Sequence, residues 1–460
     1  NMPKQFKKNL HPSLFERTFQ ILNCYDSHVH YFATGEIDFI PSLKSVSSIR
    51  DIQNLKFDLA KRKNNWIYGF GWDESKWLVP TEIHRSQLDL LFPESPVLFS
   101  RIDGHSSWCN TKALVELGFI SATSLQLTDL GRQFNSKYQS IEMDQLGNLT
   151  GILKEAAHIH ALFKMGDWSL QQKESMFQTA NQIFTKQGYT HVRDMTSTMD
   201  QYQILQNLED AQALTMNLDL NFVVENRDQF KSLLTDLKKE NLPPSKQIRC
   251  RGFKVFYDGS LGSETALISE KYPNGKNGVA LWELQDVKAL MFSAFQNGFE
   301  VSVHTLGDQA VDDIVSIAME ISQAGIFGRL NLEHLELCRS ETIQKMKALH
   351  IRCHMQPAYW LSDKSWLLQK LPSMKSQMFQ WELLRAAKVD LRFGSDSPIE
   401  NPSVFQIQNG LVDSANDGIL PFKGDFKAHC TSPYQDQISG QTKFDENGQI
   451  HVWFNEEKIQ

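Results

Sequence analysis

Two histidines stand two residues apart near the start of the chain, in the stretch "CYDSHVHYFATG" (24–35). In a β-strand, residues i and i+2 point to the same face, so His28 and His30 would lie side by side, with Asp26 just before them. Two neutral imidazoles on one face can bind one metal ion, because histidine is the commonest metal ligand in proteins. The alternative is a pair of histidines on a solvent-exposed strand. The spacing of this pair leaves both readings open.

Other polar residues lie where further strand-like stretches end. The stretches "FKVFYDG", "VSVHTLGD", "LNLEH" and "RFGSDSP" contain, in order, Lys254, His304, His334 and Asp396. Each has an ordinary explanation when taken alone: an ion-pair lysine, hydrogen-bonded core histidines, and an aspartate in a turn or helix cap. In a (β/α)₈ barrel, however, the C-terminal ends of several strands surround one active site. The joint pattern therefore predicts one site built on strands 1, 4, 5, 6 and 8.

The elements that must position these residues alternate along the chain. Helical patterns such as 171–188 and 286–298 end in glycine, as a C-cap would, and separate short β-branched or aromatic runs. Such alternation is typical of βα units around a parallel sheet, and we predict an α/β fold, a TIM-like (β/α)₈ barrel. An open doubly wound sheet is the alternative, but no glycine-rich phosphate turn follows an early strand. The runs are 96–104, 189–195, 218–226, 251–260, 299–308, 329–337, 351–357 and 389–398.

Two parts of the chain do not follow this alternation. We predict a barrel over residues 24–420 with a tryptophan-rich insertion at about 66–165. We also predict a small C-terminal β region over 421–460, packing with residues 1–23. The stretch 441–460 reads as a hairpin with Asn447-Gly448 at its turn, whereas "HPSLFERTFQIL" (11–22) reads as a helix.

Composition excludes several classes of protein. The 460 residues are 41% hydrophobic and 22% charged, which suits a soluble globular protein with a large core. A net charge of −7 argues against a nucleic-acid or anionic-membrane partner. The six cysteines are scattered with no Cys-x-x-Cys pair, which favours reduced thiols. We find neither an apolar run long enough to span a bilayer nor a signal peptide, and we expect a cytoplasmic protein.

Ten motifs in order resemble the amidohydrolase superfamily, and within it the branch called amidohydrolase 3, which includes N-substituted formamide deformylase. They extend from about Cys24 to Phe405. Less sequence precedes His28 than is usual in the family, so the resemblance implies a reduced β-sandwich beside the barrel. The motifs are "DSHVH" (26–30), "GWDESKW" (71–77), "PVLFSRIDGHSSWCNTKAL" (96–114), "GILKEAA" (151–157), "GYTHVRDM" (188–195), "KVFYDGSLGSETA" (254–266), "VSVHTLGDQAV" (301–311), "LEHLEL" (332–337), "MQPAYW" (355–360) and "FGSDSP" (393–398).

The resemblance implies two divalent metal ions. His28 and His30 would bind the first, together with Asp396, and His304 and His334 would bind the second. Lys254 would react with carbon dioxide and bridge the two ions as a carbamate. Imidazole and carboxylate-type oxygen ligands suit zinc best, with iron or manganese less favoured.

The activity implied is hydrolysis of an amide or related non-peptide C–N bond in a small-molecule substrate. A metal-bound hydroxide would attack, and Asp396 would act first as general base and then as general acid. One alternative is a deaminase or isomerase of the same superfamily with a single metal ion and no carbamate. Another is a barrel that has become a non-catalytic scaffold. The oligomeric state is left open by the sequence, although a homodimer is common among relatives.

The insertion offers candidate substrate-binding residues, each with a structural alternative. Tryptophans at such spacing are more often core than pocket, and the charged residues could equally form a buried ion-pair network. Two acidic residues, Glu155 and Asp258, could instead orient the metal ligands. The substrate-binding candidates are Trp72, Arg101, Asp103, His105 and Trp108.

Overall fold

Eight parallel strands form one continuous sheet, and each strand pairs with the next along the chain. The computed structural model describes residues 10–459 except 56, 59–60, 75–76, 78, 80, 102–105, 139, 239–241, 263 and 456, and leaves the side chains of 137, 138, 155 and 458 undescribed. The eight strands are β2 (Tyr25–Val29), β8 (His191–Ser197), β9 (Asn217–Val223), β10 (Ile248–Phe256), β11 (Glu300–Thr305), β12 (Leu330–His334), β13 (Arg352–Met355) and β14 (Asp390–Phe393).

The sheet closes on itself between its first and last strands. A bridge links Val29 to Ser397, the amide of Asp396 donates to the carbonyl of His28 at 2.8 Å, and the amide of His30 donates to the carbonyl of Ser397 at 2.8 Å. Gly394 makes this approach possible, since a Cβ there would lie 2.6 Å from the His28 nitrogen. The predicted (β/α)₈ TIM-like barrel is therefore confirmed.

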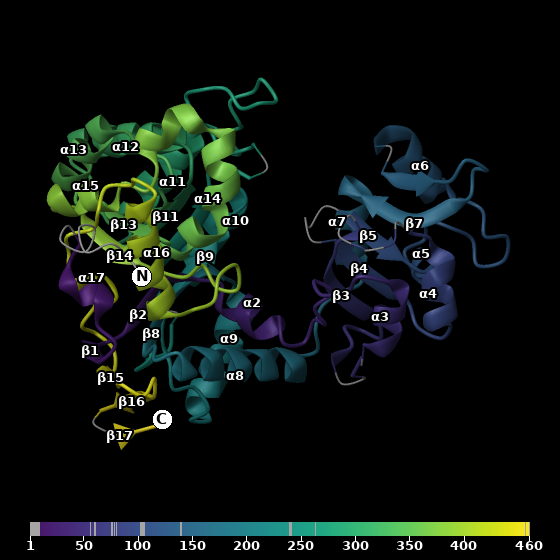
Figure 1. Ribbon diagram of the computed structural model, residues 1–460, viewed down its shortest axis with the longest axis horizontal. Helices are drawn as coiled ribbons and strands as arrows, with labels where there is room; N and C mark the ends of the chain where they lie inside the picture. Colours follow the sequence, from purple (N-terminus) through teal and green to yellow (C-terminus); the bar gives the residue numbers. More distant parts are fainter. Residues whose placement is uncertain are drawn as a thin grey trace. The chain divides into compact units, whose positions relative to one another are not determined.

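Helices flank the strands on the outside of the barrel (Figure 1). Strand β12 illustrates why helices must cover the sheet, because the strand is buried on both faces. Its apolar residues Leu330 and Leu332 alternate with the polar Asn331 and Glu333. The helices in this part of the chain are α2 (Tyr31–Glu36), α8 (Leu170–Lys186), α9 (Met199–Asp210), α10 (Arg227–Asp236), α11 (Leu284–Gln296), α12 (Asp308–Gln323), α13 (Ser340–Ala348), α14 (Ala358–Lys370), α15 (Trp381–Ala386), α16 (Val404–Asn416) and α17 (Phe426–His429).

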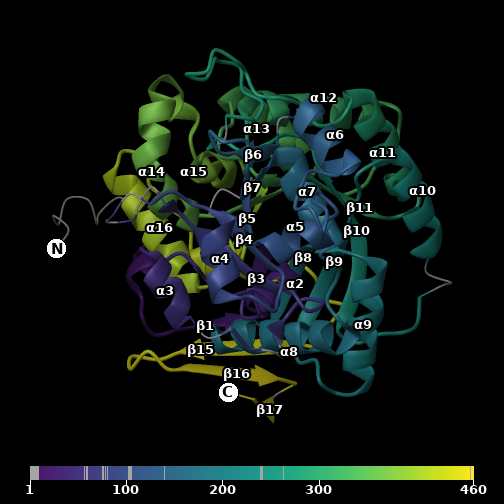
Figure 2. The same ribbon diagram turned by 90° about the vertical axis from the view of Figure 1, so that its right-hand side faces the viewer.

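A second, four-stranded antiparallel sheet joins the two ends of the chain. Its order is β1 (Phe19–Leu22), β15 (Gly440–Phe444), β16 (Ile450–Phe454) and β17 (Glu457–Lys458), and Figure 2 draws its C-terminal strands in yellow. The hairpin predicted at 441–460 is thus present. The helix predicted at 11–22 is wrong, since only Pro12–Phe15 forms a short 3₁₀ turn. Phe19 and Ile21 alternate inward, and Phe19 packs against Phe444 with ring centroids 4.6 Å apart.

The chain divides into two compact units, which we call the barrel unit (Asn1–Thr34 with Gln178–Gln460) and the insertion unit (Gly35–Phe177). The insertion unit has its own five-stranded sheet, with hydrophobic clusters around Trp108 and around Leu153. Its strands, in sheet order, are β3 (Ile67–Trp72), β4 (Val97–Arg101), β5 (Ser106–Cys109), β7 (Leu149–Lys154) and β6 (Ile141–Met143), and its helices are α3 (Ile49–Asn54), α4 (Arg85–Leu91), α5 (Thr111–Glu116), α6 (Asp129–Tyr138) and α7 (Glu155–Lys164).

None of the helices that the structure describes is both long and apolar enough to cross a membrane.

Candidate metal centre

The six predicted metal ligands all lie at or near the C-terminal ends of barrel strands. Counted along the chain, these are strands 1, 4, 5, 6 and 8, as the spacing predicted. The imidazole of His334 lies centrally, with ring centroids 4.6 Å from His28 and 4.7 Å from His304. The ligand candidates are His28 and His30 at the end of β2, Lys254 in β10, His304 in β11, His334 at the end of β12, and Asp396 after β14.

Three of these side chains form a tight group that can hold one ion. Asp396 Oδ1 lies 2.8 Å from His30 Nε2 and 3.4 Å from His28 Nε2. One ligand atom from each residue lies within 4.8 Å of the other two. The closure of β14 against β2 makes this group, because it places Asp396 directly beside the two histidines.

The other ring nitrogen of His28 and His334 is held by a neighbouring side chain. His28 Nδ1 donates to Glu333 Oε2 at 2.6 Å, and His334 Nδ1 donates to Gln356 Oε1 at 2.9 Å. Each donation fixes the tautomer and leaves Nε2 with its lone pair, as a metal-binding histidine requires.

His30 and His304 also each have one ring nitrogen beside a neighbouring polar group. His30 Nδ1 lies 3.1 Å from Thr196 Oγ1, and its Nε2 faces Asp396 Oδ1 at 2.8 Å. His304 is reversed, since its Nε2 donates to the carbonyl of Gly259 at 2.9 Å and leaves Nδ1 as the acceptor. The side chains that contact these histidines, Glu333, Thr196 and Gln356, were not predicted from the sequence, although Glu333 directly precedes His334 in "LEHLEL".

Three buried nitrogen atoms at this site have no hydrogen-bond partner among the described residues: His28 Nε2, Lys254 Nζ and His304 Nδ1. Unpartnered buried polar atoms are rare in native proteins, and each needs an explanation. Here all three belong to predicted metal ligands at one end of the barrel. The donor set therefore fits divalent metal ions.

Burial and charge set the protonation of these ligands. Burial lowers the pKa of Lys254 to about 8, which makes a neutral amine accessible near physiological pH. Burial and the nearby Lys254 lower the pKa of His304 to about 3, so its imidazole is neutral. Burial alone would raise the pKa of Asp396, but His28 and His30 hold it well below its usual value. The neutral imidazole of His304 and the ionised carboxylate of Asp396 suit metal binding, and the lowered pKa of Lys254 makes its neutral amine accessible.

The backbone is strained where two ligands leave their strands. His334 and Asp396 have φ angles of 76° and 59°, in the left-handed region that non-glycine residues rarely adopt. Strain of this kind is concentrated at functional sites, where the surrounding structure maintains it.

Asp258 lies beside His304, with Oδ1 3.8 Å from His304 Nε2. Its carboxylate accepts the backbone amides of Leu306 and Gly307 at 3.0 Å each, and that of Leu267 at 2.9 Å. Burial raises its pKa to about 7. Asp258 therefore holds the loop that follows His304, and its role in orienting the metal ligands stays a prediction.

The ligands open into a cavity of about 470 Å³ in the barrel unit. Tyr359 lines this cavity, and its hydroxyl donates to Asp396 Oδ2. Burial raises the pKa of Tyr359 well above its usual value, so the hydroxyl stays protonated. Tyr359 was not predicted as a site residue, although the motif "MQPAYW" contains it.

The substrate-binding residues predicted in the insertion are placed differently. Trp72 and Trp108 are buried in the core of the insertion unit, where their ring centroids lie 5.8 Å apart. Arg101 donates to Asp73 at 3.2 Å and to Glu74 at 3.1 Å. Asp103, His105 and the side chain of Glu155 lie outside the described residues. Substrate contact by these residues stays a prediction.

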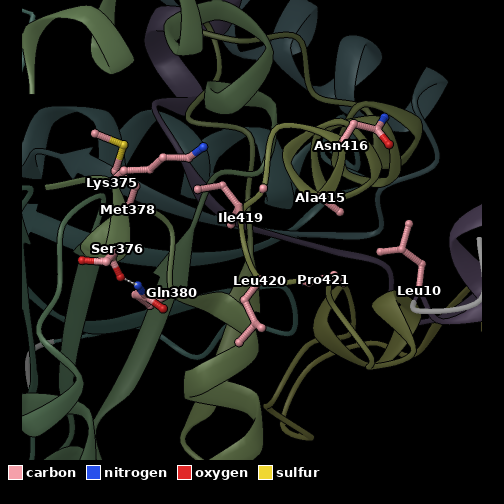
Figure 3. A pocket seen from close by; sticks show the side chains of 11 residues that line it. Leu10, Lys375, Ser376, Met378, Gln380, Ala415, Asn416, Ile419, Leu420 and Pro421 are labelled. Carbon is pink, nitrogen blue, oxygen red and sulfur yellow. Dashed lines mark hydrogen bonds between the residues drawn. The ribbon is translucent and has the colours of Figure 1, made fainter. Parts of the chain in front are cut away.

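Another cavity, of about 380 Å³, lies elsewhere in the barrel unit (Figure 3). Its lining includes Leu10, Met378 and Ile419, and among the side chains described there we find no histidine, cysteine or carboxylate. Its one charged residue, Lys375, donates to the backbone carbonyl of Asp417 at 2.7 Å. Of these two cavities, the one of about 470 Å³ is therefore the one lined by histidines and carboxyl groups.

Comparison with known proteins gives consistent matches. The family model described as "Amidohydrolase family" matches residues 25–412. The chain is 27% identical over 386 residues to "Putative amidohydrolase YtcJ" of Bacillus subtilis, covering 82% of this chain and 69% of that protein. It is 26% identical over 396 residues to "Protein LONG AFTER FAR-RED 3" of Arabidopsis thaliana, covering 81% and 65%.

Two solved structures share the fold. One is an uncharacterized metal-dependent hydrolase from Pyrococcus furiosus, with a TM-score of 0.69, 24% identity, and coverage of 86% of this chain and 77% of that one. The other is an uncharacterized metal-dependent hydrolase from Pyrococcus horikoshii, with a TM-score of 0.70, 22% identity, and coverage of 90% and 78%.

Proposed function

Because the chain belongs to the amidohydrolase family, we propose that it hydrolyses an amide or related non-peptide C–N bond in a small molecule, using two divalent metal ions. One observation carries this proposal. Three buried nitrogens without partners among the described residues, on His28, Lys254 and His304, lie at the same end of the barrel as Asp396. A metal-dependent hydrolase needs such a set of deprotonated ligands.

The ligands divide into two groups. His28, His30 and Asp396 would hold one ion, and His304 and His334 would hold the other. Nitrogen and carboxylate ligands favour zinc. When bound, such ions lower the pKa of a water molecule towards about 7 and polarise a carbonyl group.

Lys254 would complete the site as a carbamate. A protonated ammonium cannot bind a metal, but the neutral amine can attack the carbon of carbon dioxide and release a proton. The product would be an anionic group whose two oxygen atoms could serve as metal ligands. Burial lowers the pKa of this amine to about 8, so its neutral form is far more accessible than in an exposed lysine.

Asp396 is suited to move a proton between the attacking water and the leaving nitrogen. Its Oδ2 accepts from the Tyr359 hydroxyl and its Oδ1 faces the two histidines, so the carboxylate is fixed in orientation. A carboxylate near the reacting atoms can take the proton from water and return it to the nitrogen as the C–N bond breaks.

A mononuclear deaminase or isomerase is the second candidate. The group of His28, His30 and Asp396 favours it, because these three residues form a complete cluster without Lys254.

The test is metal content per chain after loading with zinc and bicarbonate. We expect about two equivalents in the natural protein and about one in Lys254→Ala, whereas Lys443→Ala, an exposed lysine in β15, should keep two. One equivalent that does not depend on Lys254 would favour the mononuclear enzyme. No metal would favour a non-catalytic scaffold. The loaded protein is then assayed with N-substituted formamides and N-acyl amines.

A further inference from the structure

The cavity beside the proposed metal ligands is lined by more carboxyl groups than the proposed chemistry uses. Besides Asp396, three carboxylates line it: Glu336 after β12, Asp363 in α14, and Glu400 after β14. Neither a lysine nor an arginine is present among the described residues of this lining. Burial raises the pKa of Asp363 to about 6, and the nearby Glu400 contributes to this increase.

Glu336 is the deepest of the three. It is 2% exposed, and its Oε2 has no hydrogen-bond partner within the described part of the chain. A buried carboxylate oxygen without a donor is costly, so such a group is normally kept to meet a cation or a hydrogen-bond donor. No ion pair is observed for Glu336 in the described structure, nor for Asp363 or Glu400.

Aromatic rings complete the wall around these carboxylates. Phe256, Tyr359 and Trp366 line the same cavity, and Trp366 Nε1 donates to Asp363 at 3.2 Å. Aromatic faces and carboxylates together are the usual surroundings of an organic cation. Lys370 Nζ lies 5.2 Å from the centroid of the Trp366 ring, but it donates to the carbonyl of Gly262 at 2.5 Å and lies 3.6 Å from Glu264.

We propose that Glu336, Asp363 and Glu400 form a subsite for an organic cation, so that the substrate carries an ammonium or guanidinium group beside its scissile C–N bond. That the bound cation is a substrate rests on the proposed hydrolytic function, but binding of a cation to the subsite can be measured without any hydrolysis. With Lys254 as a carbamate and Asp396 on the metal, these three carboxylates are the groups left to meet the substrate. They would therefore determine specificity.

The experiment uses titration calorimetry on the zinc-loaded protein. The probe is benzyltrimethylammonium, because this quaternary cation can neither ligate a metal nor lose a proton, and benzyl alcohol is the neutral comparison. We expect the cation to bind at least about tenfold more tightly than the alcohol. That preference should be lost in Glu336→Gln and in Asp363→Asn. It should persist in Glu446→Gln, which removes an exposed charge from the hairpin turn between β15 and β16.

Equal binding of cation and alcohol by the natural protein would overturn the proposal. A preference that survives in both Glu336→Gln and Asp363→Asn would do so as well. A loss of zinc from Glu336→Gln would show that Glu336 belongs to the metal centre, and would overturn its part in the subsite. Hydrolysis is measured separately, with N-(4-aminobutyl)acetamide as the cationic substrate and N-pentylacetamide as the neutral one. If neither compound is cleaved, the result counts against the proposed function. If both are cleaved with equal kcat/KM, the result counts against the cation subsite.

Discussion

The carboxylate of Glu333 connects the metal ligands to the interior of the barrel. It accepts from His28 Nδ1 at 2.6 Å and from Arg193 at 2.7 and 3.1 Å, and neither Glu333 nor Arg193 is exposed. Burial alone would raise the pKa of Glu333, but Arg193 and His28 keep it well below its usual value. The ionised carboxylate therefore serves two partners, fixing the tautomer of His28 and neutralising a buried guanidinium.

Replacing Glu333 with glutamine should damage both roles. The substitution leaves Arg193 buried without its counter-charge, so we expect the free energy of unfolding to fall by about 3–5 kcal/mol. Zinc affinity should fall by about 10–100-fold, because His28 loses its orienting acceptor. Urea unfolding and zinc competition with a chelator measure the two effects. Glu341→Gln, at an exposed position in α13, is the matched control. Unchanged zinc affinity in Glu333→Gln would show that His28 needs no such partner.

The proposed metal centre depends on the closure of β14 against β2. Gly394 lies at this junction, where a Cβ would be 2.6 Å from the His28 nitrogen and 3.0 Å from Asp26 Oδ1. The first of these contacts is with backbone, so the two strands would have to separate to accept a side chain. A one-carbon change should thus move His28 and Asp396 apart.

Gly394→Ala should lower the free energy of unfolding by about 1–3 kcal/mol and also weaken zinc binding. Both quantities are measured by urea unfolding in the presence and absence of zinc. Gly262→Ala is the control for stability, because a Cβ at Gly262 would meet its nearest neighbour, Trp366, only at 3.8 Å. A variant that stays as stable as the natural protein and binds zinc equally well would contradict a closely packed junction.

The elements also show what a sequence can predict here and what it cannot. Strand ends are marked by local patterns, so His304 and Asp396 could be placed at one end of a barrel without any structure. Thr196 and Gln356 could not, because their contacts with ligands depend on which strands are neighbours in the sheet. The strand at Phe19–Leu22 was predicted as helix because its pairing partner, β15, lies more than 400 residues away in the chain. Local pattern carries no information about such a partner.

Across the whole molecule, buried ionisable groups make stability depend on pH in two opposing directions. Burial lowers the pKa of His191 to about 3. Burial raises the pKa of Asp26 to about 7 and that of Asp219 to about 6. Because the pKa of His191 is lowered in the fold, the unfolded state gains its proton first, and the protein loses stability as the pH falls. Because the pKa values of Asp26 and Asp219 are raised in the fold, the folded state gains their protons first, and the protein gains stability over the same range. The change of unfolding free energy with pH in the natural protein is the sum of these opposing contributions. Only the difference between the natural protein and a variant isolates the contribution of one group.

His191→Gln isolates the histidine. In the unfolded chain its imidazole titrates near pH 6.5, whereas in the fold it stays neutral down to about pH 3. Its contribution is therefore fully present above pH 6.5 and is lost as the pH falls below that value. One proton corresponds to about 1.4 kcal/mol per pH unit, so the stability advantage of the natural protein over His191→Gln should shrink by about 2 kcal/mol between pH 6.5 and 5. Urea unfolding of both proteins, freed of metal with a chelator, measures this difference at each pH. If the difference stays constant across that range, His191 takes up a proton in the fold as easily as in the unfolded chain, and the buried strand β8 must admit water at that position.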